Sequence, residues 1–182
     1  MNFIKCILIF FVFLIFMKIG IIYSKKYINR AVQLEQMKKL LNIFKVKIKF
    51  TCDTVQEIFN QLYIDTPNEI GEIFKKANEY METYSVKEAW NKSLEEAKTN
   101  FTKEDIESLK NLGKILGQTD LEGQINQIEL TQNLLENQIK EAIEEKNKNS
   151  KMYRTLGVTV GLAISIILIW EGSKKYGYKS FI

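Results

Sequence analysis

The stretch "LGKILGQTDLEGQ", residues 112–124, decides the fold, because it turns the chain from one predicted helix into the next. Three leucines at helical spacing lead up to its second glycine: Leu109, Leu112 and Leu116. Gly117 follows them at the position where a residue in the left-handed conformation closes a helix. We therefore predict a corner between two helices and not a phosphate-binding loop.

Five other positions of this corner have predicted roles. Thr119 and Glu122 have the spacing of a capping box, which would open the second helix. Gly113 costs about 1 kcal/mol relative to alanine inside a helix, so we expect it to let another backbone approach closely. Asp120 and Gln124 could cap the helix, bridge the corner or contact a partner. The candidate corner motif is Gly113, Leu116, Gly117, Asp120 and Gln124.

Apolar residues on both sides of the corner recur at three- and four-residue intervals, the spacing of one face of a helix. One face precedes the corner at Leu34, Met37, Leu41, Phe44 and Ile48, and another follows it at Ile125, Ile128, Leu135, Ile139 and Ala142. The first face needs a partner to cover it. No alternation typical of a strand lasts long enough to propose a sheet, so the sequence predicts an all-α fold.

Capping signals predict four short helices that begin before residue 110. The predicted starts are Asp53 with Gln56, Thr66 with Pro67 and Glu69, Ser85 with Glu88, and Thr102 with Glu104 and Asp105. Proline suits the first helical position, and acidic side chains in a first turn interact favourably with the helix dipole. Short helices with tight connections are expected here.

Two apolar runs lie near the ends of the chain. Residues 1–23 contain "ILIFFVFLIF" and reach the roughly 20 residues that a helix needs to cross a bilayer. No Ala-x-Ala cleavage site follows, which favours an uncleaved anchor over a signal peptide. Residues 155–171 form a second, shorter run. We predict a compact helical bundle domain flanked by N- and C-terminal transmembrane helices.

The region between the predicted spans, residues 24–154, is expected to face the cytoplasm. Nine Lys and Arg residues flank the spans on this side and four lie on the other side, and such residues are retained on the cytoplasmic side. The predicted parts of the region are a basic stem at 24–50, acidic helices at 51–110, the corner at 112–124 and a long helix at 120–154. A short basic tail at 172–182 follows the second span.

Charge is sorted along this region. Residues 24–50 hold eight Lys or Arg and one acid, whereas residues 51–110 hold seven Lys and thirteen acids. The basic stem is expected to attract anionic membrane lipid, and the acidic segment suits a basic protein partner and disfavours nucleic acid. The alternative is that the acids only solvate a helix face. The candidate partner surface is Glu69, Glu72, Glu79 and Glu82, expected in one helix, with Glu95 and Glu96 in the next.

Missing residue types argue against an enzyme. The chain has no histidine, which removes Ser-His and Cys-His arrangements and the common zinc sites. Gly113-Lys114 is followed by Ile115, so no Gly-x4-Gly-Lys-Ser/Thr phosphate loop is present. We expect no catalytic residue, no cofactor, no metal and no small-molecule substrate.

Gly157 and Gly161 form a Gly-x3-Gly pattern in the second apolar run. Small residues let helices approach closely in a membrane, where there is little hydrophobic drive between them. We predict that both glycines pack against the first span or a membrane partner, although glycine is common enough in such spans for the pattern to be accidental.

Three motifs together resemble the stage III sporulation protein AB family. "GKILGQTDLEGQ" resembles its Gly-x-x-Leu-Gly-x-x-Asp-x-x-x-Gln hallmark, "VKEAWNKSLEEA" its Glu-Ala-Trp segment, and "YRTLGVTVGLAISIILI" its closing membrane segment. The resemblance runs from about Ile22 to Ile169. The chain departs from it at "TCDTV", which has neither the glycine nor the proline of the family's usual turn, and in the tail "EGSKKYGYKSFI".

The resemblance implies a non-enzymatic membrane component of the channel between mother cell and forespore, in the mother-cell membrane around the forespore. It implies a soluble domain similar to that of the type II secretion F-type platform protein. It further implies partners among other stage III A proteins, with the AA ATPase as the one the acidic helices would meet. The alternatives are a general membrane-anchored scaffold of a secretion-like system and a pore-forming subunit.

Overall fold

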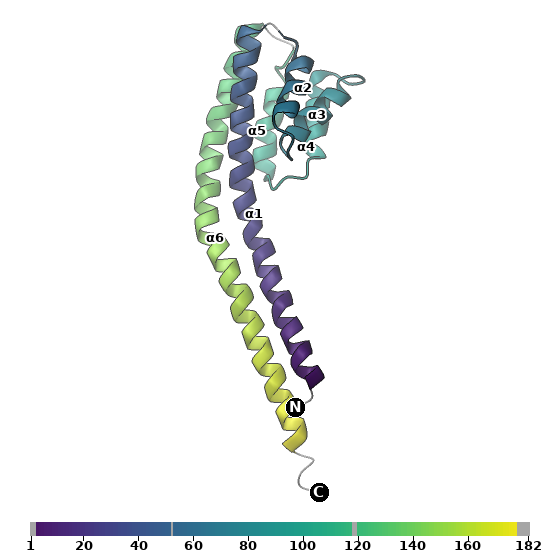
Figure 1. The fold of residues 1–182 in the computed structure, drawn as a ribbon. Helices are drawn as coiled ribbons and strands as arrows, with labels where there is room; N and C mark the ends of the chain where they lie inside the picture. The colour runs from purple at the N-terminus through teal and green to yellow at the C-terminus, as the bar shows by residue number, and fades with distance from the viewer. Residues whose placement is uncertain (1–2, 52, 118–119, 178–182) are drawn as a thin grey trace. The chain divides into compact units, whose positions relative to one another are not determined.

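The computed structural model describes the backbone of residues 3–51, 53–117 and 120–177 and the side chains of residues 7–51, 53–117 and 120–170. All elements in this part of the chain are α-helices (Figure 1). They are α1 (Phe3–Phe50), α2 (Val55–Asp65), α3 (Gly71–Tyr80), α4 (Val86–Glu95), α5 (Lys103–Gly113) and α6 (Leu121–Gly177). The prediction of an all-α fold is confirmed.

The chain divides into two compact units, each of which contains parts of α1 and α6. The first, here called the terminal hairpin, comprises residues 1–28 and 144–182; the second, the helical domain, comprises residues 29–143. Both long helices run through the predicted boundaries at 23, 154 and 171 without a break. No helix begins or ends at these boundaries, so the secondary structure does not mark where the predicted spans end.

The helical domain is built on the two apolar faces predicted from the sequence. Every residue of both faces is buried except Ile125, which is half-buried against the core. Helices α2 to α5 supply most of the rest of this core, and in chain order each of them packs against the next. The face of α1 thus finds the cover that its spacing requires.

Four aromatic rings form the centre of this core. Phe59 contacts Phe44, Phe74 and Trp90 with ring centroids 5.4, 5.1 and 5.5 Å apart, and Phe74 lies 5.4 Å from Trp90. The Trp90 indole Nε1 donates a hydrogen bond of 2.7 Å to the carbonyl of Leu109. This bond satisfies the one polar group of the indole where it is fully buried, and it ties α4 to α5.

Two of the four predicted caps are confirmed and two are wrong. Ser85 with Glu88 and Thr102 with Asp105 form complete capping boxes. Helix α2 is capped one residue later than predicted, by Thr54 with Glu57 in place of Asp53 with Gln56. The Glu57 carboxylate accepts from the Thr54 backbone N–H at 2.7 Å, and a charged acceptor in the first turn is stronger than the amide of glutamine.

The predicted start at Thr66 fails because that residue already ends α2. Its backbone N–H donates to the carbonyl of Tyr63. Asn68 takes the capping role for α3, since its Oδ1 accepts from the backbone N–H groups of Ile70 and Gly71 at 2.9 and 3.0 Å. Pro67 lies outside the helix.

The terminal hairpin pairs α1 with α6 through glycines. A Cβ added to Gly157 would lie 2.9 Å from the carbonyl oxygen of Phe16 and 3.0 Å from the Cα of Gly20. Tyr153 stacks on Tyr23 and on Tyr27, with ring centroids 5.6 and 5.7 Å apart. By length and composition, α1 and α6 each contain a segment apolar enough to cross a membrane.

Candidate interaction surfaces

The six glutamates of the candidate partner surface are exposed or half-buried, but they are not distributed as predicted. Only Glu72 and Glu79 lie within α3; Glu69 precedes that helix and Glu82 follows it. Glu95 is the last residue of α4 and Glu96 is its C-cap. The helix is shorter than predicted at both ends, because it begins at Gly71, after the cap at Asn68, and ends at Tyr80.

Four of these acids are already engaged within the domain. Glu72 pairs with Lys75 at 3.8 Å, Glu95 with Lys110 at 2.8 Å and Glu96 with Lys76 at 3.2 Å. Glu69 accepts a hydrogen bond from the amide of Gln33 at 2.5 Å. Glu79 and Glu82 form no ion pair within the described residues, and both are exposed. The surface that a basic partner could meet is therefore smaller than the sequence implies.

Hydrogen bonds shift the pKa of one member of this surface, Glu96, and of two neighbouring groups, Tyr80 and Lys110. The Tyr80 hydroxyl donates to Glu96 at 2.6 Å; this bond and then Lys76 hold the pKa of Glu96 below its ordinary value. The same bond raises the pKa of Tyr80. Glu95 raises the pKa of Lys110 through their hydrogen bond. All three groups thus keep their usual charge at neutral pH.

A shallow hollow of about 290 Å³ lies among these acids. Glu69, Glu72 and Glu96 line it together with Lys76 and Lys98. Its apolar lining comes from Ile73 and Ala97. The mixed charge suits a polar peptide contact, and it offers no constellation typical of a reaction site.

The helix corner has the geometry of a turn. α5 ends at Gly113, and a turn of four residues leads to Gly117, whose φ of +71° lies in the left-handed region that favours glycine. Asp120 accepts from the backbone N–H of Gly123 at 3.0 Å and so caps α6, while the Gln124 side chain accepts from the N–H of Gly117 at 3.3 Å. Thr119, predicted as the cap, lies outside the described residues.

The prediction that Gly113 lets another backbone approach is wrong, because the group that lies against it is a side chain. A Cβ placed there would lie 2.6 Å from Cδ1 of Trp90. Leu116 is fully buried in the core. The corner residues therefore serve packing: they seat the buried indole and start α6.

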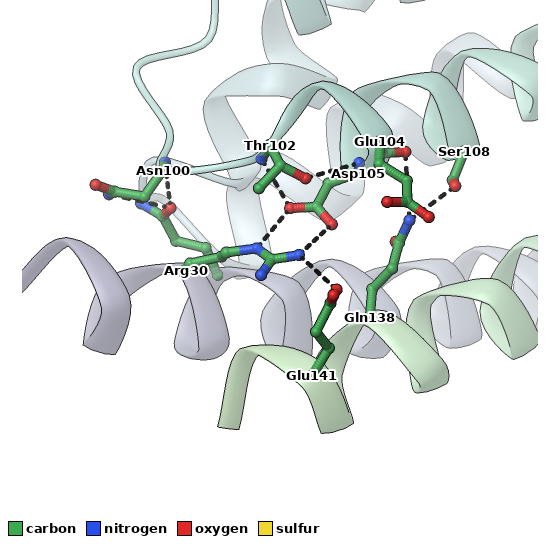
Figure 2. Close-up of polar contacts among 9 residues, drawn as sticks. Arg30, Asn100, Thr102, Glu104, Asp105, Ser108, Gln138 and Glu141 are labelled. Atoms are coloured by element: carbon green, nitrogen blue, oxygen red, sulfur yellow. Dashed lines mark hydrogen bonds and ion pairs between the residues drawn. The ribbon is translucent and has the colours of Figure 1, made fainter. Parts of the chain in front are cut away.

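A buried ion pair lies at the centre of a polar network that the sequence did not predict (Figure 2). The Arg30 guanidinium donates from Nε to Oδ2 of Asp105 at 2.9 Å and from Nη2 to Oδ1 at 3.0 Å. The two side chains are only 6% and 0% exposed. Glu141, which is largely exposed, accepts from the same guanidinium at 3.4 Å. Such bidentate geometry is the strong form of an arginine–carboxylate pair.

Asp105 has a second role, since its Oδ2 also accepts from the backbone N–H of Thr102 at 2.8 Å. One carboxylate thus completes the capping box of α5 and neutralises Arg30 of α1. Gln138 of α6 donates to Ser108 at 2.9 Å and to the carbonyl of Glu104 at 3.3 Å, as Figure 2 shows. The only sequence signal was the capping box, which places Asp105 at the start of α5 but does not name its distant partner.

Cofactor and metal sites receive no support from the described residues. No group of three or more His, Cys, Asp or Glu side chains there could hold a metal ion. Within the described residues, Arg30 and Asp105 neutralise each other.

Gly161, the other predicted packing residue of the hairpin, lies against Phe13. A Cβ there would come within 3.0 Å of the Phe13 ring and 3.4 Å of its carbonyl oxygen. The contact at Gly157 is to backbone and that at Gly161 is mainly to a side chain. The backbone at Gly157 is less able to move aside for an added side chain than the Phe13 ring at Gly161.

Known proteins resemble this chain along most of its length. The protein-family model described as Stage III sporulation protein AB matches residues 5–169. Stage III sporulation protein AB of Bacillus subtilis (strain 168) is 25% identical over 150 residues, which is 80% of this chain and 88% of that protein. A solved structure of Stage III sporulation protein AB superposes with a TM-score of 0.61 and 22% identity, over 65% of this chain and 96% of the other; at that identity the likeness concerns the fold.

Proposed function

The chain belongs to the stage III sporulation protein AB family, and on that basis we propose that it is a non-enzymatic membrane component of the channel between mother cell and forespore. Membership supports a role in sporulation. The proposed role is to couple the cytoplasmic AA ATPase to other stage III A proteins in the membrane. The two candidate spans would hold it in the mother-cell membrane around the forespore.

One observation supports the coupling proposal: two exposed acids of the helical domain form no ion pair within the described residues. Glu79 and Glu82 are exposed and form no ion pair within the described residues, whereas Glu72, Glu95 and Glu96 are paired. Complementary charge speeds encounter and fixes the register of two proteins. A basic face of the ATPase would therefore meet the Glu79–Glu82 end of α3 first.

The test measures association of the full-length protein in detergent with purified AA ATPase at low salt. Reversing both of these exposed acids, Glu79→Lys with Glu82→Lys, should slow association by about tenfold or more and flatten its salt dependence. The matched control is Glu35→Lys with Glu122→Lys, which changes the net charge equally at two exposed acids of α1 and α6. Equal rates for both pairs of variants would show that only net charge matters, and the coupling surface would be rejected.

Orientation forms a separate part of the proposal. Lysine and arginine are richer at the flanks of residues 24–154 than outside the spans, which favours a cytoplasmic helical domain. A reporter active only outside the cytoplasm and fused after residue 100 should be silent. An active reporter would reverse the orientation and remove the ATPase from reach.

A further inference from the structure

We propose that the terminal hairpin carries a binding groove for one anionic phospholipid. The groove is a hollow of about 210 Å³ between α1 and α6 of the hairpin. Gly20 and Gly157 are among its lining residues, at the place where the backbones of the two helices come into contact. The proposal rests on the membrane placement given above, and it assigns a ligand to that part of the molecule.

The walls of the groove are apolar and partly exposed. Ile19, Leu156 and Val160 line it with 42%, 46% and 40% of their surface exposed. They belong to the segments of α1 and α6 that are candidate membrane spans. An acyl chain is the apolar group that surrounds such a segment in a bilayer, and it can follow a narrow groove.

One end of the groove is aromatic. Tyr23 and Tyr153 line it there, and their stacked rings lie 5.6 Å apart. Tyrosine is enriched where a membrane meets water, because one end of its ring is apolar and the other polar. This end therefore marks the depth at which the glycerol of a phospholipid lies.

Beyond the tyrosines, both helices continue the same face with lysine. Lys26 follows Tyr23 by three residues, and Lys146 precedes Tyr153 by seven, both helical intervals. At 1.5 Å per residue, Lys146 lies about 10 Å along the axis from Tyr153, within reach of a headgroup. Residues 24–28 and 144–154 together hold six Lys or Arg and two Glu.

The order of these features decides between the possible occupants. Apolar walls, then phenol rings, then ammonium groups match the acyl chain, glycerol and phosphate of an anionic phospholipid. A transmembrane helix from a second copy would need small or apolar contacts along the groove, but no cations at its end. The cationic end thus favours lipid.

The test is native mass spectrometry of the full-length protein released from micelles that contain equal amounts of phosphatidylglycerol and phosphatidylcholine. The wild type should retain one phosphatidylglycerol. Val160→Trp fills the groove and should lose this lipid, whereas Leu162→Trp, on the same helix and also exposed but outside the groove, should keep it. If Val160→Trp keeps its lipid and instead abolishes crosslinking between two copies, the groove is a helix-docking site and the proposal fails.

Charge variants test the headgroup end without altering the groove. Lys26→Gln with Lys146→Gln should weaken phosphatidylglycerol binding about thirtyfold, at about 1 kcal/mol for each basic residue, and leave phosphatidylcholine unchanged. Lys25→Gln with Lys148→Gln is the matched control. Equal loss in both pairs, or equal retention of both lipids by the wild type, overturns the proposal.

Membrane insertion is followed separately by alkaline carbonate extraction of the same variants. A wild-type protein that is extracted would contradict the proposed membrane role itself. A protein that stays inserted but retains no lipid contradicts only the groove.

Discussion

The same two helices pair in both units of the chain, but by different contacts. In the helical domain, α1 and α6 contribute buried apolar side chains to a common core. They are linked at its surface by Lys38 with Glu136 at 2.9 Å and Lys45 with Glu129 at 3.3 Å. In the terminal hairpin, they meet at Gly20 and Gly157, backbone against backbone. In the helical domain large side chains hold α1 and α6 together. In the terminal hairpin the absence of side chains at Gly20 and Gly157 lets the two helices approach closely.

This difference agrees with the proposed placement of the hairpin in a membrane and of the helical domain in water. In water, burial of apolar surface is the main favourable term, so large side chains between helices stabilise the domain. Within a bilayer the lipid tails are as apolar as leucine, and close packing at small residues replaces that term. Between α1 and α6, removing side-chain groups should therefore weaken the pairing in the helical domain, and adding them should weaken the pairing in the hairpin.

Loss of the buried ion pair should produce the largest effect. Asp105→Asn leaves Arg30 buried without its bidentate partner, which should lower the free energy of unfolding by about 3–5 kcal/mol. Urea unfolding of the full chain in detergent can be followed by Trp90 alone in a Trp170→Phe background.

Glu141→Gln is the control for this experiment. Glu141 contacts the same guanidinium, but its side chain is 58% exposed, so its loss should cost no more than about 1 kcal/mol. Equal costs for the two variants would show that burial does not strengthen the pair.

In the terminal hairpin, adding a side chain at a glycine should separate α1 from α6. Gly157→Ile places a Cβ against the backbone of Phe16 and Gly20, so the helices must separate at a cost of about 1–3 kcal/mol. Oxidative crosslinking of cysteines placed at Tyr23 and Tyr153, with Cys6 and Cys52 replaced by serine, should then fall about tenfold.

Gly161→Ile should reduce the same crosslinking by a smaller factor than Gly157→Ile. Its Cβ meets mainly the Phe13 ring, which can move, so crosslinking should fall less. Val158→Leu, at an exposed neighbour, should have no effect. Undiminished crosslinking in Gly157→Ile would mean that the glycines have no packing role.

Local features of the fold could be predicted from the sequence, and distant pairings could not. Periodicity located both apolar faces, and capping boxes located Ser85 and Thr102, because these signals span only a few residues. Arg30 and Asp105 are separated by 75 positions, and no spacing rule joins them. The candidate acids were identified by charge, but their lysine partners depend on how α3, α4 and α5 pack.

Gly113 in the helical domain tests whether the packing around Trp90 tolerates an added methyl group. Gly113→Ala would bring a methyl group to 2.6 Å from the Trp90 ring, so the buried indole must shift at a cost of about 1–3 kcal/mol, partly offset by the better helix propensity of alanine. The emission spectrum of Trp90 should change. Gly117→Ala has room but a φ of +71°, so it should destabilise the domain by about 1–2 kcal/mol without altering that spectrum. The same spectral change in both variants would reject direct contact as the cause.

The smallest effect is expected where side chains pair in water. Tyr80→Phe removes the hydrogen bond that contributes most to the lowered pKa of Glu96, while Lys76 remains in place. The pKa should therefore rise towards its ordinary value without reaching it. Because a lowered folded-state pKa stabilises only the ionised form, the contribution of Glu96 is present above its unfolded pKa and is lost as pH falls through its folded pKa. The variant should accordingly be less stable near neutral pH by a small amount, and this difference should vanish in acid.

Carboxyl carbon NMR titration measures the pKa of Glu96 and that of a control residue, Glu88, in the same experiment. The pKa of Glu96 should change in Tyr80→Phe, and that of Glu88, which is lowered by Ser85, should not. If Glu96 titrates unchanged, the Tyr80 contact does not persist in solution, and exposed pairs in this domain contribute even less than their geometry implies.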